Sequence, residues 1–156
     1  MSDPHQRLAE LGISLPIPPK PVASYVGYRI AGDIVHVSGQ LPLADGKLTQ
    51  AGLLGDGVEV EAGAAAARLC AVNLLAQLAA ACAGDLGRVR ACIRLGGFVA
   101  SAPGFTGQPK VINGASDLMV EVFGSEVGQH ARAAVGVAAL PLGASVEVEG
   151  TFQIAP

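Results

Sequence analysis

The chain has 156 residues, a formal net charge of −3 and a sequence pI of about 5.5. This length fits one domain. Hydrophobic residues make up 51% of the chain and charged residues 15%, which is well below the usual share of about 25% in globular domains. The sequence has no block of Lys or Arg, so it lacks the clustered cations that nucleic-acid binding needs. The low charge predicts that self-association covers part of the surface.

The sequence also indicates a compartment. The segment 1–6 lacks the charge and the apolar stretch of a secretory signal. The longest apolar run, 69–83, is interrupted by Asn73 and Gln77 and is too short for a membrane span. We therefore expect a cytoplasmic protein. Its cysteines form no CxxC pair and its histidines have no metal-ligand spacing, which predicts reduced, buried thiols and no metal site; the cysteines are Cys70, Cys82 and Cys92.

The first 22 residues are predicted to form an N-terminal unit. The segment His5–Leu11 is mildly amphipathic and predicts a short helix, whereas the prolines of 15–21 forbid helix and favour an extended path. Residues 23–156 are predicted to form a single domain. It begins with two strands, 25–30 and 34–38, which Gly32 and Asp33 join in a tight hairpin.

A glycine-rich loop over 43–57 follows, and long loops of this kind are often functional. Helical spacing of apolar residues then predicts a helix from Glu59 to about Ala83 and a second one over 110–123. Period-2 alternation between the helices predicts a strand over 89–100. One face of that strand would carry Val89, Ala91, Ile93 and Leu95.

Two further strands are expected, over 133–137 and 145–152, as a hairpin about a turn at 140–143. The resulting order, ββαβαββ, predicts an α+β fold with one sheet and two helices packed on one of its faces. The other face of the sheet would be left uncovered. We expect it to pack against the sheet of a neighbouring chain, which agrees with the low charge.

The residues with most chemical potential lie near the C-terminus. Arg132 is an isolated cation among small apolar residues, and Glu147 and Glu149 follow it. A guanidinium fork matches a carboxylate bidentately, so a carboxylate ligand is one candidate partner of Arg132. In a symmetric terminal hairpin Arg132 would face Thr151 rather than Glu147, so local spacing does not unite the arginine with that carboxylate.

At these positions the sequence resembles the RidA/YjgF/UK114 family. The resemblance is carried by Ser38-Gly-Gln-Leu-Pro42, by Ala131-Arg132 with Ala-Ala-Leu-Pro141, and by Val146-Glu-Val-Glu149, and it spans roughly residues 22–153. It is greatest to the longer branch that is named for an endoribonuclease activity. The resemblance implies a chorismate mutase-like fold, a homotrimer with sites in the clefts between subunits, and no cofactor. It also implies hydrolysis of reactive enamines and imines, such as 2-aminoacrylate and 2-iminopropionate, to 2-keto acids and ammonia.

The resemblance assigns roles residue by residue. Arg132 would grip the substrate carboxylate and Glu147 would hold the attacking water. The cleft would be completed by Tyr25, Ser38, Gly39, Asn113 and the backbone carbonyl of Ala134. The chain departs from the family at His130, where a proline is common, and in the loop 43–57.

Two other functions stay open at this point. The chain could be an endoribonuclease acting on single-stranded RNA, or a non-catalytic binder of small carboxylates such as keto acids. The individual residues also have plain structural interpretations: Arg132 as an ion-pair partner, Glu147 as a solvated strand charge and Asn113 as a helix cap.

Overall fold

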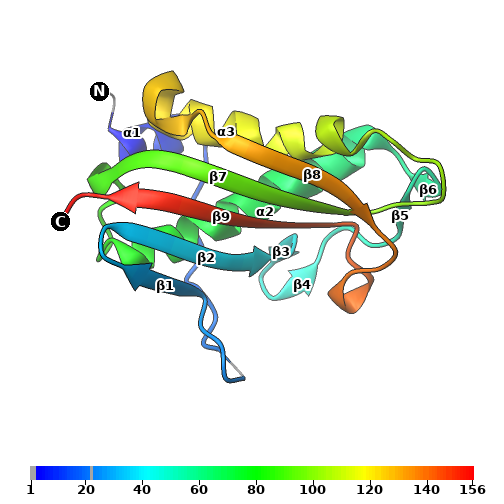
Figure 1. The fold of residues 1–156 in the computed structure, drawn as a ribbon, viewed down its shortest axis with the longest axis horizontal. Helices are drawn as coiled ribbons and strands as arrows, with labels where there is room; N and C mark the ends of the chain where they lie inside the picture. The colour runs from blue at the N-terminus through cyan, green and yellow to red at the C-terminus, as the bar shows by residue number, and fades with distance from the viewer. Residues whose placement is uncertain (1–2, 22) are drawn as a thin grey trace.

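The computed structural model describes residues 3–21 and 23–156; residues 1, 2 and 22, all from the predicted N-terminal unit, lie outside the described residues. The predicted α+β architecture is confirmed. Five strands form one mixed sheet in the order β1-β2-β9-β7-β8, with two long helices on one face (Figure 1). The strands are β1 (Tyr28–Ala31), β2 (Ile34–Gln40), β7 (Val89–Ala100), β8 (Ala131–Val137) and β9 (Val146–Ile154). The helices are α2 (Val60–Ala81) and α3 (Gln108–Gly128).

The terminal strands do not form the predicted hairpin. β7 lies between β8 and β9, so Leu95 pairs with Arg132 on one side, in parallel, and with Gly150 on the other, antiparallel. The reason is the helix between β7 and β8. A strand, a crossover helix and a second strand form a parallel unit, and this leaves the other edge of β7 for β9.

The alternation predicted for β7 is also wrong in part. Cys92 and Leu95 are both buried, whereas Ile93 is 40% exposed. The pairing of β7 with β9 shifts between Cys92 and Arg94. A bulge of this kind adds one residue and exchanges the faces of the strand, which a strict period of two does not anticipate.

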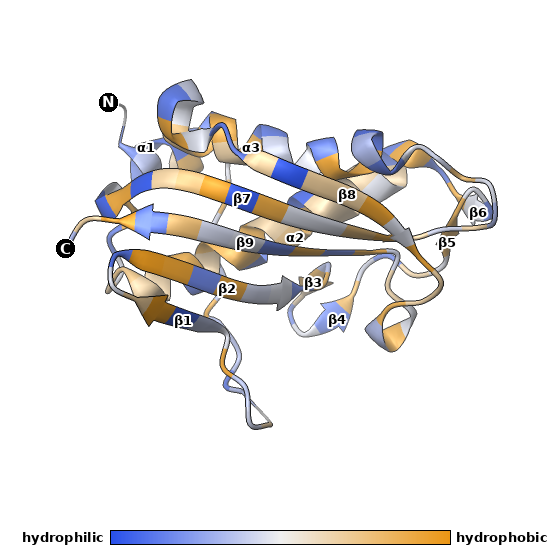
Figure 2. Ribbon diagram, in the orientation of Figure 1, coloured by the Kyte–Doolittle hydropathy of each residue, from blue (hydrophilic) through white to orange (hydrophobic). Residues whose placement is uncertain are grey.

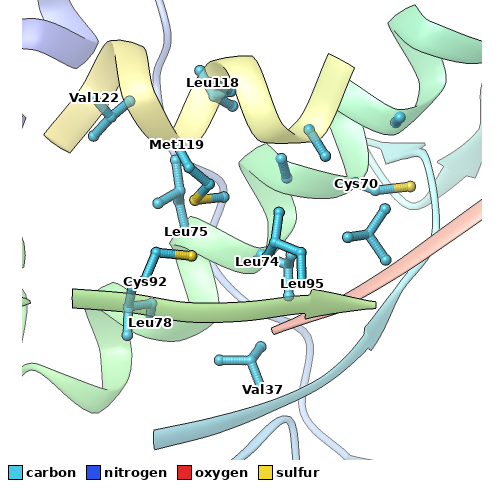
Figure 3. Packing of buried hydrophobic residues seen from close by; sticks show 14 of the residues in the cluster. Val37, Cys70, Leu74, Leu75, Leu78, Cys92, Leu95, Leu118, Met119 and Val122 are labelled. Carbon is cyan, nitrogen blue, oxygen red and sulfur yellow. The ribbon is translucent and has the colours of Figure 1, made fainter. Parts of the chain in front are cut away.

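The core lies between the sheet and the two helices. Figure 3 shows Leu74 of α2 next to Leu95 of β7, and Leu75 of α2 next to Met119 of α3; all four side chains are fully buried. Five apolar residues predicted to face inward from α3 are buried as expected: Ile112, Ala115, Leu118, Met119 and Val122. With few aromatic residues, the core depends on close packing of aliphatic side chains.

The helix α2 is long and apolar enough to cross a membrane by length and composition. It is nevertheless a core helix, packed against the sheet and α3, and 56% of its most apolar window is buried. The three cysteines are buried and unpaired, as predicted. Burial raises the pKa of the Cys92 thiol to about 12, which keeps it protonated and unreactive at neutral pH.

The remaining elements are short. The N-terminal helix α1 (Pro4–Glu10) packs against α3 and places Leu8 in the common core. The following segment, 14–21, contains no helix or strand. The division of the chain at residues 22 and 23 stays a prediction.

The loop 43–57 contains two small strand pairs, β3 (Leu43–Ala44) with β4 (Lys47–Leu48) and β5 (Leu53–Leu54) with β6 (Gly57–Val58). Two 3-10 turns complete the fold, η1 (Leu86–Arg88) and η2 (Pro141–Gly143).

The contact between α2 and α3 makes a prediction for Gly114. A Cβ at this position would collide with the backbone carbonyl of Ala64 in α2. Alanine normally stabilises a helix relative to glycine, but we expect Gly114→Ala to destabilise the protein by about 1–3 kcal/mol, because the helices must separate. Thermal and urea unfolding measure the change.

The matched control is Gly63→Ala in α2. Its new Cβ would meet only side-chain atoms of Leu54 and Val111, which can move aside. A smaller loss of stability is expected there, and equal losses in the two variants would contradict the proposed backbone contact.

Candidate functional site

Arg132 lies on β8, an edge strand, and points toward α3. Its partner across the strand, Leu95, faces the core, so Arg132 is on the helix-covered side of the sheet. The Nη1 nitrogen donates to Asn113 Oδ1 at 2.9 Å and to Ser116 Oγ at 3.1 Å. The Nη2 nitrogen donates to the Pro109 carbonyl at 3.4 Å. These bonds hold the guanidinium against the first three turns of α3.

The pattern of donors decides what Arg132 can still bind. A guanidinium has five N–H groups, and both hydrogens of Nη1 are committed to α3. Among the described residues, Nε–H and one hydrogen of Nη2 have no protein acceptor. Two donors on neighbouring nitrogens form the fork that binds a carboxylate bidentately. The arginine is therefore held by one edge and open at the other.

Glu147 lies on the opposite face of the sheet. Alternate residues of β9 point to the helices, beginning with Val146 and Val148, so Glu147 and Glu149 point to the uncovered face. The Glu147 carboxylate lies directly over Gly39 of β2, where a Cβ would collide with it. The absence of a side chain at Gly39 thus makes room for this carboxylate, and it explains the glycine in the Ser-Gly-Gln motif.

The surroundings of Glu147 favour its protonated form. Partial burial raises the pKa of this carboxyl above its ordinary value, and the nearby charge of Glu149 raises it further. Glu149 in turn forms an ion pair with Arg94 at 3.4 Å. Glu149 therefore affects the proton affinity of Glu147, although no role was predicted for it.

Tyr25 and Ser38 lie near Gly39. The hydroxyl of Ser38 donates to the Val26 carbonyl at 2.6 Å, and its backbone N–H donates to Gly27 at 2.9 Å. These bonds tie the segment carrying Tyr25 to the end of β2. Tyr25 is 62% exposed. Together with Ser38 and Gly39 it lines a cavity of about 250 Å³, which Pro19 and Pro21 also line.

The predicted site residues thus form two separate groups. One group is Arg132, Asn113 and Ala134, at the β8 edge and on the helix side; the other is Tyr25, Ser38, Gly39 and Glu147, around β2 and β9 (Figure 1). Arg132 on β8 and Glu147 on β9 lie two strand spacings apart, about 10 Å, and point to opposite faces of the sheet. One chain therefore does not bring Arg132 and Glu147 together, and each group is open to solvent.

Sequence reasoning did not identify Ser116, although it contacts Arg132. The available signal was the spacing of Asn113 and Ser116. Residues three apart on a helix lie on the same face, so both reach β8 together. Among the described residues, no group of three or more His, Cys, Asp or Glu side chains could hold a metal ion.

Residues 5–149 match the family model described as "YjgF/chorismate_mutase-like, putative endoribonuclease". The chain belongs to this family. It is therefore a relative of RidA and YjgF, as the motifs around Ser38, Arg132 and Glu147 indicated.

Individual relatives in the YjgF family agree with this placement. Protein TCP17 of Trypanosoma cruzi is 50% identical over 147 residues, which cover 94% of this chain and 91% of that protein. The crystal structure of Atu1372 from Agrobacterium tumefaciens, of unknown function, is 50% identical with a TM-score of 0.90, and the match covers 97% of this chain and 92% of that one. A "putative endoribonuclease" from Shewanella oneidensis is 35% identical with a TM-score of 0.93, covering 98% and 100%.

The electrostatics of the Glu147 group predict the effect of one substitution. Glu149→Gln removes a negative charge that raises the pKa of Glu147, so that pKa should fall. Carbon-13 NMR of the carboxyl group across a pH titration measures it directly. Glu121→Gln is the control, because Glu121 pairs with Arg68 on the helix layer and should leave Glu147 unchanged. A pKa that rises in the Glu149 variant would refute this account.

Proposed function

We propose that this protein hydrolyses reactive imines and enamines of small 2-keto acids, releasing ammonia. The observation that carries the proposal is the half-committed guanidinium of Arg132. Its Nη1 edge is held by Asn113 and Ser116, while Nε and Nη2 keep a free pair of donors. Such a fork fits the carboxylate of 2-iminopropionate or 2-aminoacrylate.

The proposed site needs a second copy of the chain. Arg132 and Glu147 lie on opposite faces of one sheet, so a cleft between two subunits is the arrangement that would unite them. The uncovered sheet face offers partly exposed apolar residues to a neighbour, including Ile93 and Val135. We infer a homotrimer, in which each cleft takes Arg132, Asn113 and Ala134 from one chain and Tyr25, Ser38, Gly39 and Glu147 from the next.

The proposed reaction is the hydrolysis of the carbon–nitrogen double bond of the imine by one water molecule. Arg132 holds the carboxylate, and Glu147, as a carboxylate, accepts a proton from a water molecule whose oxygen bonds to the imine carbon. Glu147 returns this proton to the nitrogen, which gives a carbinolamine. The hydroxyl proton of the carbinolamine then passes to the nitrogen as the carbon–nitrogen bond breaks, so ammonia leaves and a keto acid remains. A pKa raised by burial makes Glu147 a better proton acceptor than an ordinary surface carboxylate. Positioning supplies most of the effect.

A small carboxylate ligand also agrees with one relative. The crystal structure of Escherichia coli TdcF, which shares the fold at 19% identity and a TM-score of 0.61, contains bound serine. Serine carries the carboxylate that the Arg132 fork would recognise. Ribonuclease action is less well supported, because phosphate binding needs several free cations. The chain has a formal net charge of −3 and no block of Lys or Arg.

Removing the arginine tests the carboxylate anchor. We expect Arg132→Ala to lower kcat/KM for 2-iminopropionate by about two orders of magnitude, because two charge-assisted hydrogen bonds are lost. Arg132→Lys should recover only part of this loss, since an ammonium is a point charge without a fork. Ammonia release, corrected for spontaneous hydrolysis, is the measurement. Unchanged turnover in Arg132→Ala would refute the proposed function.

Mixing two inactive variants tests the shared site. Arg132→Ala and Glu147→Gln each spoil every cleft of their own trimer. When the two are unfolded, mixed in equal amounts and refolded together, hybrid trimers contain clefts with both native residues. Random mixing should restore about a quarter of the wild-type activity.

The assembly itself is checked by light scattering, which should give three times the 15.6 kDa chain mass. If the mixture stays as inactive as its components while the native protein is active, Arg132 and Glu147 do not act in one cleft.

A further inference from the structure

His130 and Ser116 are connected to Arg132 by an unbroken series of hydrogen bonds. Arg132 Nη1 contacts Ser116 Oγ at 3.1 Å, Ser116 Oγ contacts His130 Nε2 at 2.9 Å, and His130 Nδ1 contacts the Gly128 carbonyl at 2.7 Å. The series joins the end of α3 to the edge strand β8.

For a neutral imidazole, the direction of every bond follows from its two ends. An arginine only donates and a backbone carbonyl only accepts. His130 Nδ1 therefore carries the hydrogen that the Gly128 carbonyl accepts, and in the neutral ring Nε2 has a free lone pair. The Ser116 hydroxyl donates to that lone pair, which turns its own lone pairs toward the Arg132 N–H. The neutral ring with hydrogen on Nδ1 is thus the form that completes the series.

The far end of the series is rigid. At Gly124 α3 is interrupted by a left-handed residue, with φ of 77°, and the chain folds back over the helix. Gly128 then lies so close to the helix that a Cβ there would collide with the backbone carbonyl of Met119. A carbonyl fixed in this way can hold His130, and His130 can hold Ser116.

We propose that His130 and Ser116 form a positioning relay for the Arg132 fork. A free arginine side chain has considerable rotamer entropy, and ordering it on binding would cost affinity. Without Ser116 the guanidinium would be held only by Asn113, which accepts one Nη1 hydrogen, and by the long 3.4 Å bond from Nη2 to the Pro109 carbonyl. Ser116 accepts the second Nη1 hydrogen and fixes the plane of the fork, and His130 fixes the Ser116 hydroxyl. This inference rests on the proposed function for the identity of the ligand only.

A simpler role must be distinguished from the relay. His130 could merely secure the end of α3 through Gly128, in which case its loss would lower stability and leave ligand affinity alone. The relay instead predicts that Ser116→Ala and His130→Ala both weaken the binding of a carboxylate. His130→Gln should restore binding, because its side-chain oxygen can accept the Ser116 hydrogen. Ser125→Ala, at an exposed serine near the end of the same helix, is the matched control.

The binding experiment uses pyruvate, the stable product of the proposed reaction, followed by NMR titration of the full-length protein. We expect Ser116→Ala and His130→Ala to raise the Kd about five-fold, with His130→Gln and Ser125→Ala within two-fold of the wild type. Thermal unfolding of each variant separates affinity from stability. An unchanged Kd in both Ser116→Ala and His130→Ala would overturn the relay.

A second measurement does not depend on any ligand. Nitrogen-15 NMR of the wild type should show His130 protonated on Nδ1 and unprotonated on Nε2, and resolved, slowly exchanging Nη signals for Arg132. Ser116→Ala should merge those Nη signals. If Arg132→Ala leaves ammonia release unchanged, the proposed function fails, and these spectra alone decide the relay. A ring protonated on Nε2, or Nη signals unaffected by Ser116→Ala, would overturn it.

Discussion

The position of β7 between β8 and β9 determines where every candidate site residue lies. Because α3 connects β7 to β8, the two strands are parallel and β8 becomes the edge of the sheet. The pairing of Leu95 with Arg132 then directs the arginine toward α3. On the other side of β7, the pairing of Phe98 with Glu147 directs the glutamate away from the helices. One strand thus separates the cation from the carboxylate.

This separation gives each half of the site a different physical character. The arginine lies against α3, where it donates to neutral acceptors, Asn113, Ser116 and a carbonyl. Neutral acceptors leave the positive charge uncompensated, so it stays available to an anionic ligand. The glutamate lies among other sheet residues, next to a second carboxylate, and its proton affinity is raised. A ligand with a carboxylate at one end and an electrophilic carbon at the other matches both halves.

Much of the fold could be predicted from the sequence because its signals are local. The helix 59–83 and the helix 110–123 follow from apolar spacing, and Gly124, with its positive φ, explains why the second regular run ends at Phe123. The strand pairing could not be predicted in the same way. The last two strands could pair with each other as a hairpin, or each could pair with β7 lying between them. Both arrangements use the same strand residues and differ only in contacts between segments far apart in the sequence. The bulge near Cys92 is likewise set by pairing with β9.

The site residues could likewise be predicted from the sequence only in part. Motifs identified Arg132, Glu147 and Gly39. The structure shows which group comes close to the glycine, since the Glu147 carboxylate occupies the space of a Cβ. Ser116 and His130 lie fourteen residues apart and carry no motif, yet they contact the same guanidinium network. Arg132 and His130 are two residues apart at the start of a strand, so their side chains point to the same side. An alternating His-Ala-Arg next to a helix bearing Asn-x-x-Ser is therefore a pattern with a physical meaning: it places on one side of the strand an arginine and the groups that hold its guanidinium.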